Sequence, residues 1–590
     1  MGSNAELAEM FARMADVMQL VGENAFKAIA FQRVSRVLEE TGIDVVAASK
    51  SGELPPIEGI GESSRRIIVE YAQTGKSRDY EQLIASVPAG VLEMLRIPGL
   101  GPKTVALLWR ERGIESVDAL EQAIGQGKLA GLKGVGAKKI ASMLDGIRLL
   151  KAGMQRRGFV VVAPLVEEML ERLRSDARVG QAEAAGSFRR RRETVGDVDL
   201  LCWVHSSEDA QAVIESFCTQ NGVEKVNASG RTKGSILVDK GFQIDLRIVP
   251  KENFGAALLY FTGSKEHNVK LRGLAQEQGM TLNEWGLYRV DQYNKAEKKP
   301  GEPPTIKPVA GGDEKSVYSA LKLGYIEPEL REDRGEIEAG IAQRLPRLVT
   351  REDIRGELHC HTTASDGRAS IEQMAEAAKA MGYEYIAITD HSVSSVIANG
   401  LAPERLKAHI AAIRKAQDRV KGIHILAGSE VDILIDGSLD YEDALLAELD
   451  VVIASPHVSL KQDTAKATDR LLRAIESRYV HIIGHPTGRM INQREGLPLD
   501  MPKVIAAAAQ AKTALEINAG WPRWDLNDLN ARAAANAGVM ISINTDAHAI
   551  ESLGDIVMGL WVARRAWLTP TQIVNCMTYK QLMAWLKVKR

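Results

Sequence analysis

The chain has 590 residues, 45% of them hydrophobic and 26% charged, and it carries a formal net charge of −2. The composition is ordinary for a globular protein, and the length exceeds what one hydrophobic core serves, so we expect roughly three to five structural units. No apolar run approaches a membrane span, and the N-terminus lacks the basic and apolar regions of a secretory signal. The four cysteines form no CxxC pair, which argues against a disulfide framework and suits a reducing cytosol.

The first 150 residues are predicted to be helical. Apolar residues such as Leu7, Phe11, Met14 and Met18 recur there at spacings of three and four. We expect an N-terminal helical DNA-binding domain over residues 1–85 and a second helical subdomain over residues 86–152.

Three breaks in this helical region share the pattern apolar-x-Gly-apolar-Gly, at residues 57–61, 97–101 and 132–136, and basic residues follow each one. This is the helix-hairpin-helix pattern, in which two glycines let the chain turn so that the amides at the next helix start face a phosphate. Such contacts reach the backbone of DNA and do not depend on its sequence. Because the pattern occurs three times, it favours DNA binding by Gly59, Gly61, Gly99, Gly101, Lys103, Gly134 and Gly136.

A basic stretch overlaps these breaks. Residues 101–192 hold 18 Lys and Arg against 10 Asp and Glu. Such a stretch fits a surface that faces phosphates. A solvated helical face explains the same charges equally well, so charge alone leaves both interpretations open.

Two strand-like segments with acidic residues follow, at residues 197–204 and 242–249. Asp197 and Asp199 stand two residues apart, so both carboxylates point to one face of a strand, and Asp245 joins them if the two strands pair. Three such carboxylates suit two Mg²⁺ ions, which can hold a nucleoside triphosphate and lower the pKa of an attacking hydroxyl. The segment GSFRR just before the first strand can hold the distal phosphates.

These segments belong to a larger set of motifs that resembles the family X DNA polymerases, the polymerase beta-like group, over residues 1–335. The matching residues are GSFRR (186–190), DVD (197–199), Asp245, ALLYFTGS (257–264) and NEWGLY (283–288). The resemblance implies a nucleotidyltransferase palm over residues 153–252 and a thumb that selects the nucleotide over residues 253–335. It also implies Mg²⁺ or Mn²⁺ at Asp197, Asp199 and Asp245, with Asp245 closest to the primer 3′-hydroxyl.

The same resemblance assigns the nucleotide contacts. It places Ser187, Arg190 and Gly263 at the triphosphate. Tyr260 and Phe261 match the turn that crowds the 2′ position of the sugar; a buried aromatic pair is the structural alternative, and the motif context outweighs it. The remaining matches, at the nascent base pair or the template, are Asn268 and Arg272.

The sequence departs from the family at two positions. Ile67 stands where repair members carry a Schiff-base lysine, and Arg65 and Arg66 cannot replace it, because guanidinium stays protonated and is a poor nucleophile. We therefore expect no polymerase beta-type lyase at this place. Lys265 stands where that polymerase has an acid near the incoming base, so nucleotide affinity is expected to differ.

Nine His, Asp and Glu residues in the C-terminal part stand at or just beyond the ends of short hydrophobic runs. They are His359, His361, Asp366, His391, Glu430, His457, His485, Asp546 and His548. One strand end cannot supply a whole transition-metal site, but several strands that converge on one face of a barrel can. The pattern therefore predicts a hydrolytic site with several metal ions.

The motifs HCHTTASDG, TDH, GSEVDI, SPH, GHP and NTDAH resemble the PHP (polymerase and histidinol phosphatase) superfamily over residues 355–590, after a linker at residues 336–354. The resemblance implies a distorted (β/α)7 barrel and makes all nine residues ligands of two or three Mn²⁺, Zn²⁺ or Fe²⁺ ions, with Glu430 as the bridge. Asp390, just before His391, is expected to support the metal ligands from behind or to be structural, and not to bind metal itself. A barrel that serves only as a scaffold is the alternative, and it is disfavoured because every motif position keeps a side chain able to bind metal.

The order of these parts is similar to that of the bacterial-type family X DNA polymerases. We expect a multidomain protein with a helical helix-hairpin-helix N-terminal region, an α+β nucleotidyltransferase palm and thumb, and a C-terminal distorted (β/α)7 PHP barrel. The expected function is gap filling in DNA repair, with a metal-dependent 3′→5′ exonuclease, AP endonuclease or 3′-phosphatase in the barrel. Expected partners are gapped or nicked DNA and dNTPs, without a membrane, for a cytoplasmic, nucleoid-associated monomer.

Two other interpretations stay open at this point. One is a gap-filling polymerase whose PHP domain is structural only. The other is a module that binds DNA ends and has weak catalysis. A phosphoesterase for a small phosphorylated metabolite is disfavoured by the three hairpins.

Overall fold

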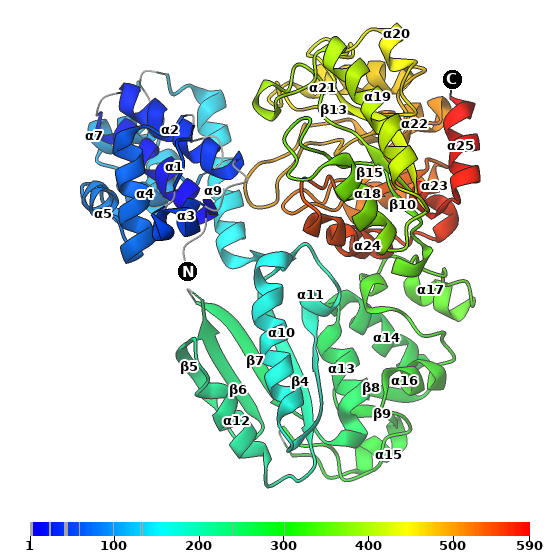
Figure 1. The fold of residues 1–590 in the computed structure, drawn as a ribbon. Coiled ribbons are helices and arrows are strands. Elements are labelled where there is room, and N and C mark those ends of the chain that lie inside the picture. The colour runs from blue at the N-terminus through cyan, green and yellow to red at the C-terminus, as the bar shows by residue number, and fades with distance from the viewer. Residues whose placement is uncertain are drawn as a thin grey trace. The chain divides into compact units, whose positions relative to one another are not determined.

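The computed structural model describes residues 4–22, 25–40, 45–52, 54–57, 59–97, 100–129, 131–132, 134–239, 241–299 and 301–589. The chain divides into two compact units, Met1–Gln155 and Arg156–Arg590 (Figure 1). Among the described helices, none combines the length and apolar character that a bilayer crossing demands.

The first unit is helical over its described residues. Its helices are α1 (Asn4–Val21), α2 (Ala25–Glu40), α3 (Val45–Ser51), α4 (Glu62–Thr74), α5 (Arg78–Ala85), α6 (Ala89–Met94), α7 (Pro102–Arg112), α8 (Val117–Gly125) and α9 (Ala137–Gln155). Leu7, Phe11, Met14 and Met18 lie on the buried face of α1, as their spacing predicts, and Phe11 meets Phe31 of α2 edge to face. A second core gathers the apolar residues of α6 to α9.

The second unit begins with a five-stranded sheet in the order β2-β4-β7-β6-β5. Its strands are β2 (Val179–Ala184), β4 (Asp197–Val204), β5 (Val223–Ser229), β6 (Lys233–Val238) and β7 (Phe242–Ile248). Strands β4 and β7 run parallel, and the other neighbours run antiparallel. The helices α10 (Phe159–Ser175), α11 (Gly186–Arg189) and α12 (Ala210–Cys218) accompany this sheet, and β1 (Arg157–Gly158) pairs with β3 (Thr194–Val195) beside it.

Helices and a two-stranded ribbon follow the sheet. They are η1 (Lys251–Asn253), α13 (Phe254–Thr262), α14 (Lys265–Glu277), β8 (Met280–Asn283), β9 (Gly286–Arg289), α15 (Val290–Lys295), α16 (Glu314–Ala320), η2 (Pro328–Leu330), α17 (Glu336–Ile341) and η3 (Arg351–Asp353). The segment 336–354, expected to be a linker, is therefore partly helical. It is also packed, because Glu336 is fully buried and its Oε1 lies 2.7 Å from Nδ1 of the buried His267.

Seven parallel strands form the C-terminal part, each next to its sequence neighbours. They are β10 (Gly356–Glu357), β11 (Tyr385–Ile388), β12 (His424–Asp432), β13 (Val451–Ser455), β14 (Ile482–Ile483), β15 (Ala514–Asn518) and β16 (Ile541–Asn544). A parallel bridge between Cys360 and Ala547 draws the first and last strands together. The predicted distorted (β/α)7 barrel is confirmed.

Helices connect and cover the barrel strands (Figure 1). They are α18 (Ile371–Ala380), η4 (Val396–Ala398), α19 (Pro403–Arg419), α20 (Asp443–Leu446), α21 (Thr464–Glu476), α22 (Met501–Ala511), α23 (Asp528–Asn536), η5 (Glu551–Asp555), α24 (Ile556–Arg565), η6 (Pro570–Gln572), η7 (Val574–Cys576) and α25 (Tyr579–Val588). The barrel strands are almost wholly buried, which explains why they read as continuous apolar runs.

The five-stranded sheet and the barrel share one hydrophobic core. The ring of Phe159, in α10, stacks on Phe188 at 4.6 Å and meets Trp561 of the barrel at 4.9 Å between centroids. Gly158 lies so close to Trp521 that an added Cβ would fall 2.2 Å from the indole ring. The two parts therefore pack as the interior of one domain does.

Replacing Phe159 by Ala should lower the free energy of unfolding by about 3–5 kcal/mol, because it opens a cavity between sheet and barrel. Val161→Ala, on the same helix but with its side chain 59% exposed, is the matched control and should cost little. Denaturant unfolding of both variants measures the difference. Equal losses would mean that Phe159 does not join the two parts.

Candidate functional site

The three candidate aspartates lie on two neighbouring strands. Asp199 of β4 is directly opposite Asp245 of β7, and Asp197 is opposite Gln243. Oδ1 of Asp245 accepts hydrogen bonds from Ser235 at 2.6 Å and from Gln243 at 2.9 Å. The groups of described residues whose ligand atoms all lie within 4.8 Å of one another do not include these three. The strands thus bring the aspartates to one place, while Asp245 is held by neighbouring polar groups.

The closeness of the three carboxylates shows in the pKa of Asp199. Burial, together with the nearby charges of Asp197 and Asp245, raises the pKa of Asp199 to about 6. A divalent cation favours the ionised form of such a carboxylate and relieves the repulsion, so the aspartates fit a cation site.

The predicted triphosphate contacts surround the start of α11. Gly186 has a φ of +62°, and a Cβ built on it would lie 3.8 Å from Oδ2 of Asp199, with Ser187 next in the chain. The guanidinium of Arg190 donates to the carbonyl of Thr262 and, through Nε, to Oε1 of Glu332 at 3.1 Å. Two of its nitrogens are thus engaged with protein, a feature that the motif does not reveal.

The predicted nucleotide-selecting residues lie around the end of α13 and the start of α14. The rings of Tyr260 and Phe261 meet edge to face at 5.1 Å, and the guanidinium of Arg247 lies 4.5 Å from the Phe261 centroid. Nδ2 of Asn268 donates to the carbonyl of Tyr260 at 2.7 Å, which fixes this turn. Arg272 lies one turn further along α14 and is partly exposed.

Glu430, at the end of β12, is the centre of the barrel cluster. Its carboxylate lies 2.9 Å from Nδ1 of His391, 3.0 Å from Nε2 of His485 and 3.3 Å from Nε2 of His457. The ligand-bearing segments follow different strands and meet at one end of the barrel. Glu430 itself is almost fully buried.

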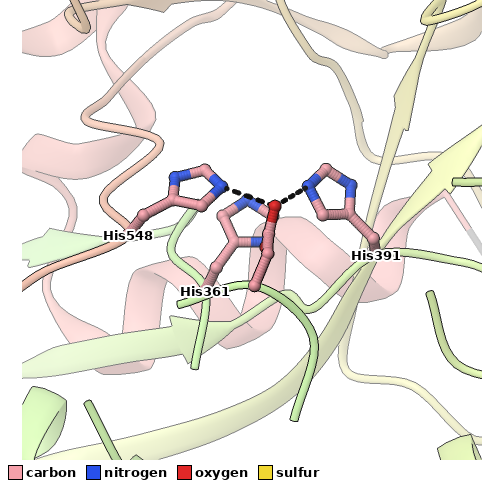
Figure 2. Close-up of side chains that lie close together, drawn as sticks. His361, His391 and His548 are labelled. Carbon is pink, nitrogen blue, oxygen red and sulfur yellow. Dashed lines mark ion pairs between the residues drawn. The ribbon is translucent and has the colours of Figure 1, made fainter. Parts of the chain in front are cut away.

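A second part of the cluster gathers around Asp366. Figure 2 shows His361, His391 and His548 with their rings close together, and Oδ2 of Asp366 lies 3.6 Å from His391 and 3.4 Å from His548. The ring of His361 stacks on those of His391 and His548 at 4.3 and 4.2 Å. Each of the three imidazoles has a ring nitrogen within 3.9 Å of a carboxylate oxygen of Asp366.

The barrel residues form three groups with metal-ligand spacing. These groups are His361, Asp366, His391 and His548; His359, His361, Glu430 and Asp546; and His391, Glu430 and His457. His485 joins through its contact with Glu430, so all nine predicted ligands come together. Glu430, His361 and His391 each belong to two groups, and of these three only Glu430 has two carboxylate oxygens with which to bridge two ions.

Several buried nitrogen atoms of the cluster lack a hydrogen-bond partner in the described part of the chain, which shows whether metal ions would fit there. Nε2 of His359, Nδ1 of His361 and Nδ1 of His485 are buried and make no hydrogen bond to any described residue. Orphaned donors and acceptors are costly in a protein interior. Mixed imidazole and carboxylate ligation suits Mn²⁺, Zn²⁺ or Fe²⁺, so the residues fit the ions that the motifs imply.

Further residues orient the ligands, and the sequence pattern did not reveal them. Glu516 accepts from Nδ1 of His359 at 2.8 Å, and Asp432 accepts from Nδ1 of His457 at 2.7 Å, which turns both Nε2 atoms inward. Asp432 lies two residues after Glu430 on the same strand, which is the one signal that the sequence offered. Asp390 pairs with His409 at 2.8 Å and supports the loop after β11 from outside the cluster.

Carboxylates and imidazoles in the barrel cluster shift each other's pKa. Burial favours the neutral form of Glu430, but the charges of His457, His359 and His391 hold its pKa well below the usual value. Burial likewise disfavours charge on His457, yet Glu430 and Asp432 raise its pKa to about 10. In the metal-free protein His457 therefore holds a proton, which a metal ion must displace.

The three predicted hairpins share one turn geometry. Backbone hydrogen bonds link Ile57 to Ile60, Ile97 to Leu100 and Leu132 to Val135 at 3.0–3.1 Å. Gly59 and Gly134 have φ of +91° and +79°, which favours glycine, while Gly99 lies outside the described residues. Gly61, Gly101 and Gly136 precede α4, α7 and α9, and a Cβ on any of them would meet open space. The turns therefore allow close approach of another molecule, with Lys103 in the first turn of α7.

Comparison with protein families divides the chain into helix-hairpin-helix, polymerase and barrel parts, as the structure does. Residues 2–77 match a helix-hairpin-helix domain, residues 91–149 a SAM-like helix-hairpin-helix tandem, residues 257–332 the DNA polymerase beta thumb, and residues 357–518 the PHP domain.

One relative matches across almost the whole chain, and others match one part of it. A DNA polymerase/3′-5′ exonuclease PolX of Bacillus subtilis (strain 168) is 36% identical over 586 residues, which is 99% of both chains. The chain belongs to the PolX family. DNA polymerase lambda of Rattus norvegicus is 26% identical over 347 residues, or 56% of each chain. A probable phosphatase of Thermoanaerobacter sp. (strain X514) is 29% identical over 245 residues, covering 40% of this chain and 95% of its own. This PolX chain thus joins a polymerase-like part to a phosphatase-like part.

Asp199→Asn should stabilise the metal-free protein at neutral pH. The pKa of Asp199 is raised, so its contribution to stability is present below its unfolded-state pKa and is lost as the pH rises through about 6. An amide of the same size removes that loss, on the order of 2 kcal/mol. Unfolding with a chelator across this pH range measures the difference between variant and wild type. A variant that is less stable than wild type at neutral pH would contradict the assigned repulsion.

Proposed function

We propose that the chain fills short gaps in DNA as a template-directed repair polymerase and trims 3′ ends with its barrel. The proposal is carried by the register of β4 and β7, which sets Asp199 opposite Asp245 beside Asp197, together with the shared position of Glu430 in the barrel cluster. AP endonuclease and 3′-phosphatase reactions use the same chemistry at the barrel site. The names of the relatives support a polymerase activity and a phosphoesterase activity.

In the palm, Asp197, Asp199 and Asp245 would hold two Mg²⁺ or Mn²⁺ ions. When bound, these ions supply Lewis acidity to the primer 3′-hydroxyl and to the leaving pyrophosphate. Asp245, in the strand beside Asp199, orients the primer end. Ser187 and Gly263 line the phosphates, and Tyr260 with Phe261 crowds the sugar where a ribonucleotide carries its 2′-hydroxyl.

In the barrel, the nine clustered residues would hold two or three Mn²⁺, Zn²⁺ or Fe²⁺ ions. When bound, such ions activate water for attack on phosphorus at neutral pH. Glu516 and Asp432 keep His359 and His457 in the tautomer that presents Nε2 to the site. His359, His361, His391, Glu430 and His485 are buried, which excludes bulk water from them and strengthens the charge interactions there.

The remaining parts of the proposal concern substrates and boundaries. We assign residues 1–85 and 86–152 to DNA binding, 153–252 to the palm, 253–335 to the thumb and 355–590 to the exonuclease. Gapped or nicked DNA and dNTPs are the substrates, and the enzyme acts as a nucleoid-associated monomer. The three equivalent hairpin turns support phosphate contacts that are independent of base sequence.

Variants that separate the two sites test the function. Asp197→Ala combined with Asp199→Ala should abolish dNTP incorporation on a labelled gapped duplex with Mn²⁺, since the palm then lacks two of its three cation ligands. DNA affinity and 3′ shortening should persist, because the hairpins and the barrel are untouched. One gel resolves extension from shortening in the same preparation.

The mirror variant, His359→Ala with His361→Ala, should lose 3′ shortening and keep incorporation. If shortening persisted at the wild-type rate, the barrel would be a scaffold and the nuclease would lie elsewhere. If the aspartate variant still incorporated nucleotides, the palm assignment would fail.

A further inference from the structure

A buried glutamate joins three parts of the second unit. Oε1 of Glu332, just after η2, accepts from Nε of Arg190 at 3.1 Å and from Nη1 of Arg565 at 2.9 Å, and Oε2 accepts from Arg192 at 3.3 Å. Its side chain is 8% exposed. Burial favours its neutral form, but the guanidinium groups of Arg190, Arg565 and Arg192 hold its pKa below the usual value. Glu332 and the three arginines Arg190, Arg192 and Arg565 therefore form a charged cluster, called the hub below.

Arg565, at the end of α24 in the barrel, holds this hub from the nuclease side. Its Nη1 donates both to Glu332 and, at 2.7 Å, to the backbone carbonyl of Arg190. Its Nη2 donates to Oδ2 of Asp528 at 2.9 Å, and only 5% of the side chain is exposed. Arg565 thus fixes the backbone of Arg190 and also the carboxylate that holds the Arg190 side chain.

Arg190 in turn supports the nucleotide-selecting turn. Its Nη1 donates to the carbonyl of Thr262, and a Cβ built on Gly263 would lie 3.1 Å from that nitrogen. Ser264 is fixed from the other side, because its amide donates to the carbonyl of Arg331 at 3.0 Å. A displacement of Arg190 therefore moves the turn that carries Tyr260 and Phe261.

We propose that Arg565, a residue of the nuclease barrel, is a positioning residue for nucleotide binding in the polymerase site. It acts through Glu332 and Arg190. The affinity for dNTP therefore depends on how the barrel packs against the thumb. The inference rests on the proposed function, in which Gly263, Tyr260 and Phe261, the residues beside the Arg190 contact, bind the incoming nucleotide. A planar guanidinium suits this task, because it binds a carbonyl and two carboxylates at once.

The neighbouring Arg564 provides a matched control. Its Nε donates to Oε1 of Glu329 at 2.7 Å, so it also ties the barrel to the thumb, and its side chain is 19% exposed. Among the described residues, Arg564 makes its polar contacts with Glu329, Glu327 and the carbonyl of Val349, and not with Arg190 or Glu332. Loss of Arg564 removes a thumb-to-barrel ion pair without touching the hub.

The experiment compares Arg565→Met, Arg564→Met and wild type in single-nucleotide gap filling. Arg565→Met should raise the KM for dNTP about tenfold, with kcat and exonuclease rate within about twofold of wild type. Arg564→Met should leave the KM for dNTP unchanged. Arg565→Lys should fall between wild type and Arg565→Met, because an ammonium keeps the charge but cannot reach all three acceptors.

Glu332→Gln tests the same contact without changing Arg565, in case the Arg565 variants fail to fold. The amide keeps the size and shape of the Glu332 side chain but removes the charge that binds the three arginines. It should raise the KM for dNTP as well, and the double variant with Arg565→Met should add little, because both act through one contact. An unchanged KM for dNTP in both single variants, or an equal rise in Arg564→Met, would overturn the inference. Failure of the proposed function would look different: wild type would not incorporate nucleotides, or the Asp197 and Asp199 double variant would.

Discussion

Mutual repulsion among buried carboxylates is the constraint on which both sites depend. Strand pairing forces Asp199 to face Asp245, and barrel closure forces Glu430, Asp366 and Asp546 into one small volume. Neither arrangement is favourable without positive charge between the oxygens. In the palm the repulsion shows as the raised pKa of Asp199, whereas in the barrel the carboxylates raise the pKa of His359, His457 and His548, whose positive charge offsets it. Divalent cations neutralise the clustered carboxylates at both sites. The same positive charge then attracts the negative charge of a bound phosphate ester.

Tight packing of the polymerase-like and phosphatase-like parts gives the second unit its stiffness. Aromatic rings of α10 and α24 interdigitate, and a buried network of Arg190, Glu332, Arg565 and Asp528 crosses the same boundary. Buried ion pairs contribute little net stability, but they set geometry, since each partner has few places where its charge is matched. The barrel can therefore act as a hydrolase and, through this boundary, as a support for nucleotide binding.

Much of the fold was predictable because the ligands mark the ends of the barrel strands. Motifs at or near the ends of β10, β11, β12, β13, β14 and β16 close buried apolar runs, so a metal site at one end of a barrel followed from one pattern, while the set of nine candidate ligands followed from the resemblance to the PHP superfamily. The hairpin turns were predictable for a similar reason, since glycine spacing is local. The aspartates of β4 and β7 needed one further assumption, namely that the two strands pair.

Interactions between distant segments were not predictable in this way. Arg565 at the end of α24 and Glu332 in the loop after η2 read as ordinary surface charges, and nothing local indicates that they meet across 233 positions. Glu516 and Asp432 likewise look like acids within strands until His359 and His457 are placed beside them. The helix in residues 336–354 was missed because the charged composition resembles a linker, while burial of Glu336 depends on His267 far upstream.

Anomalous diffraction from crystals grown with Mn²⁺ tests the central claim most directly. The account predicts ions within the three barrel groups, with Glu430 shared between two of them, and ions beside Asp199 and Asp245 once a nucleotide is present. Anomalous peaks absent from both places at saturating Mn²⁺ would contradict it, because the clustered carboxylates would then be stabilised by something other than cations.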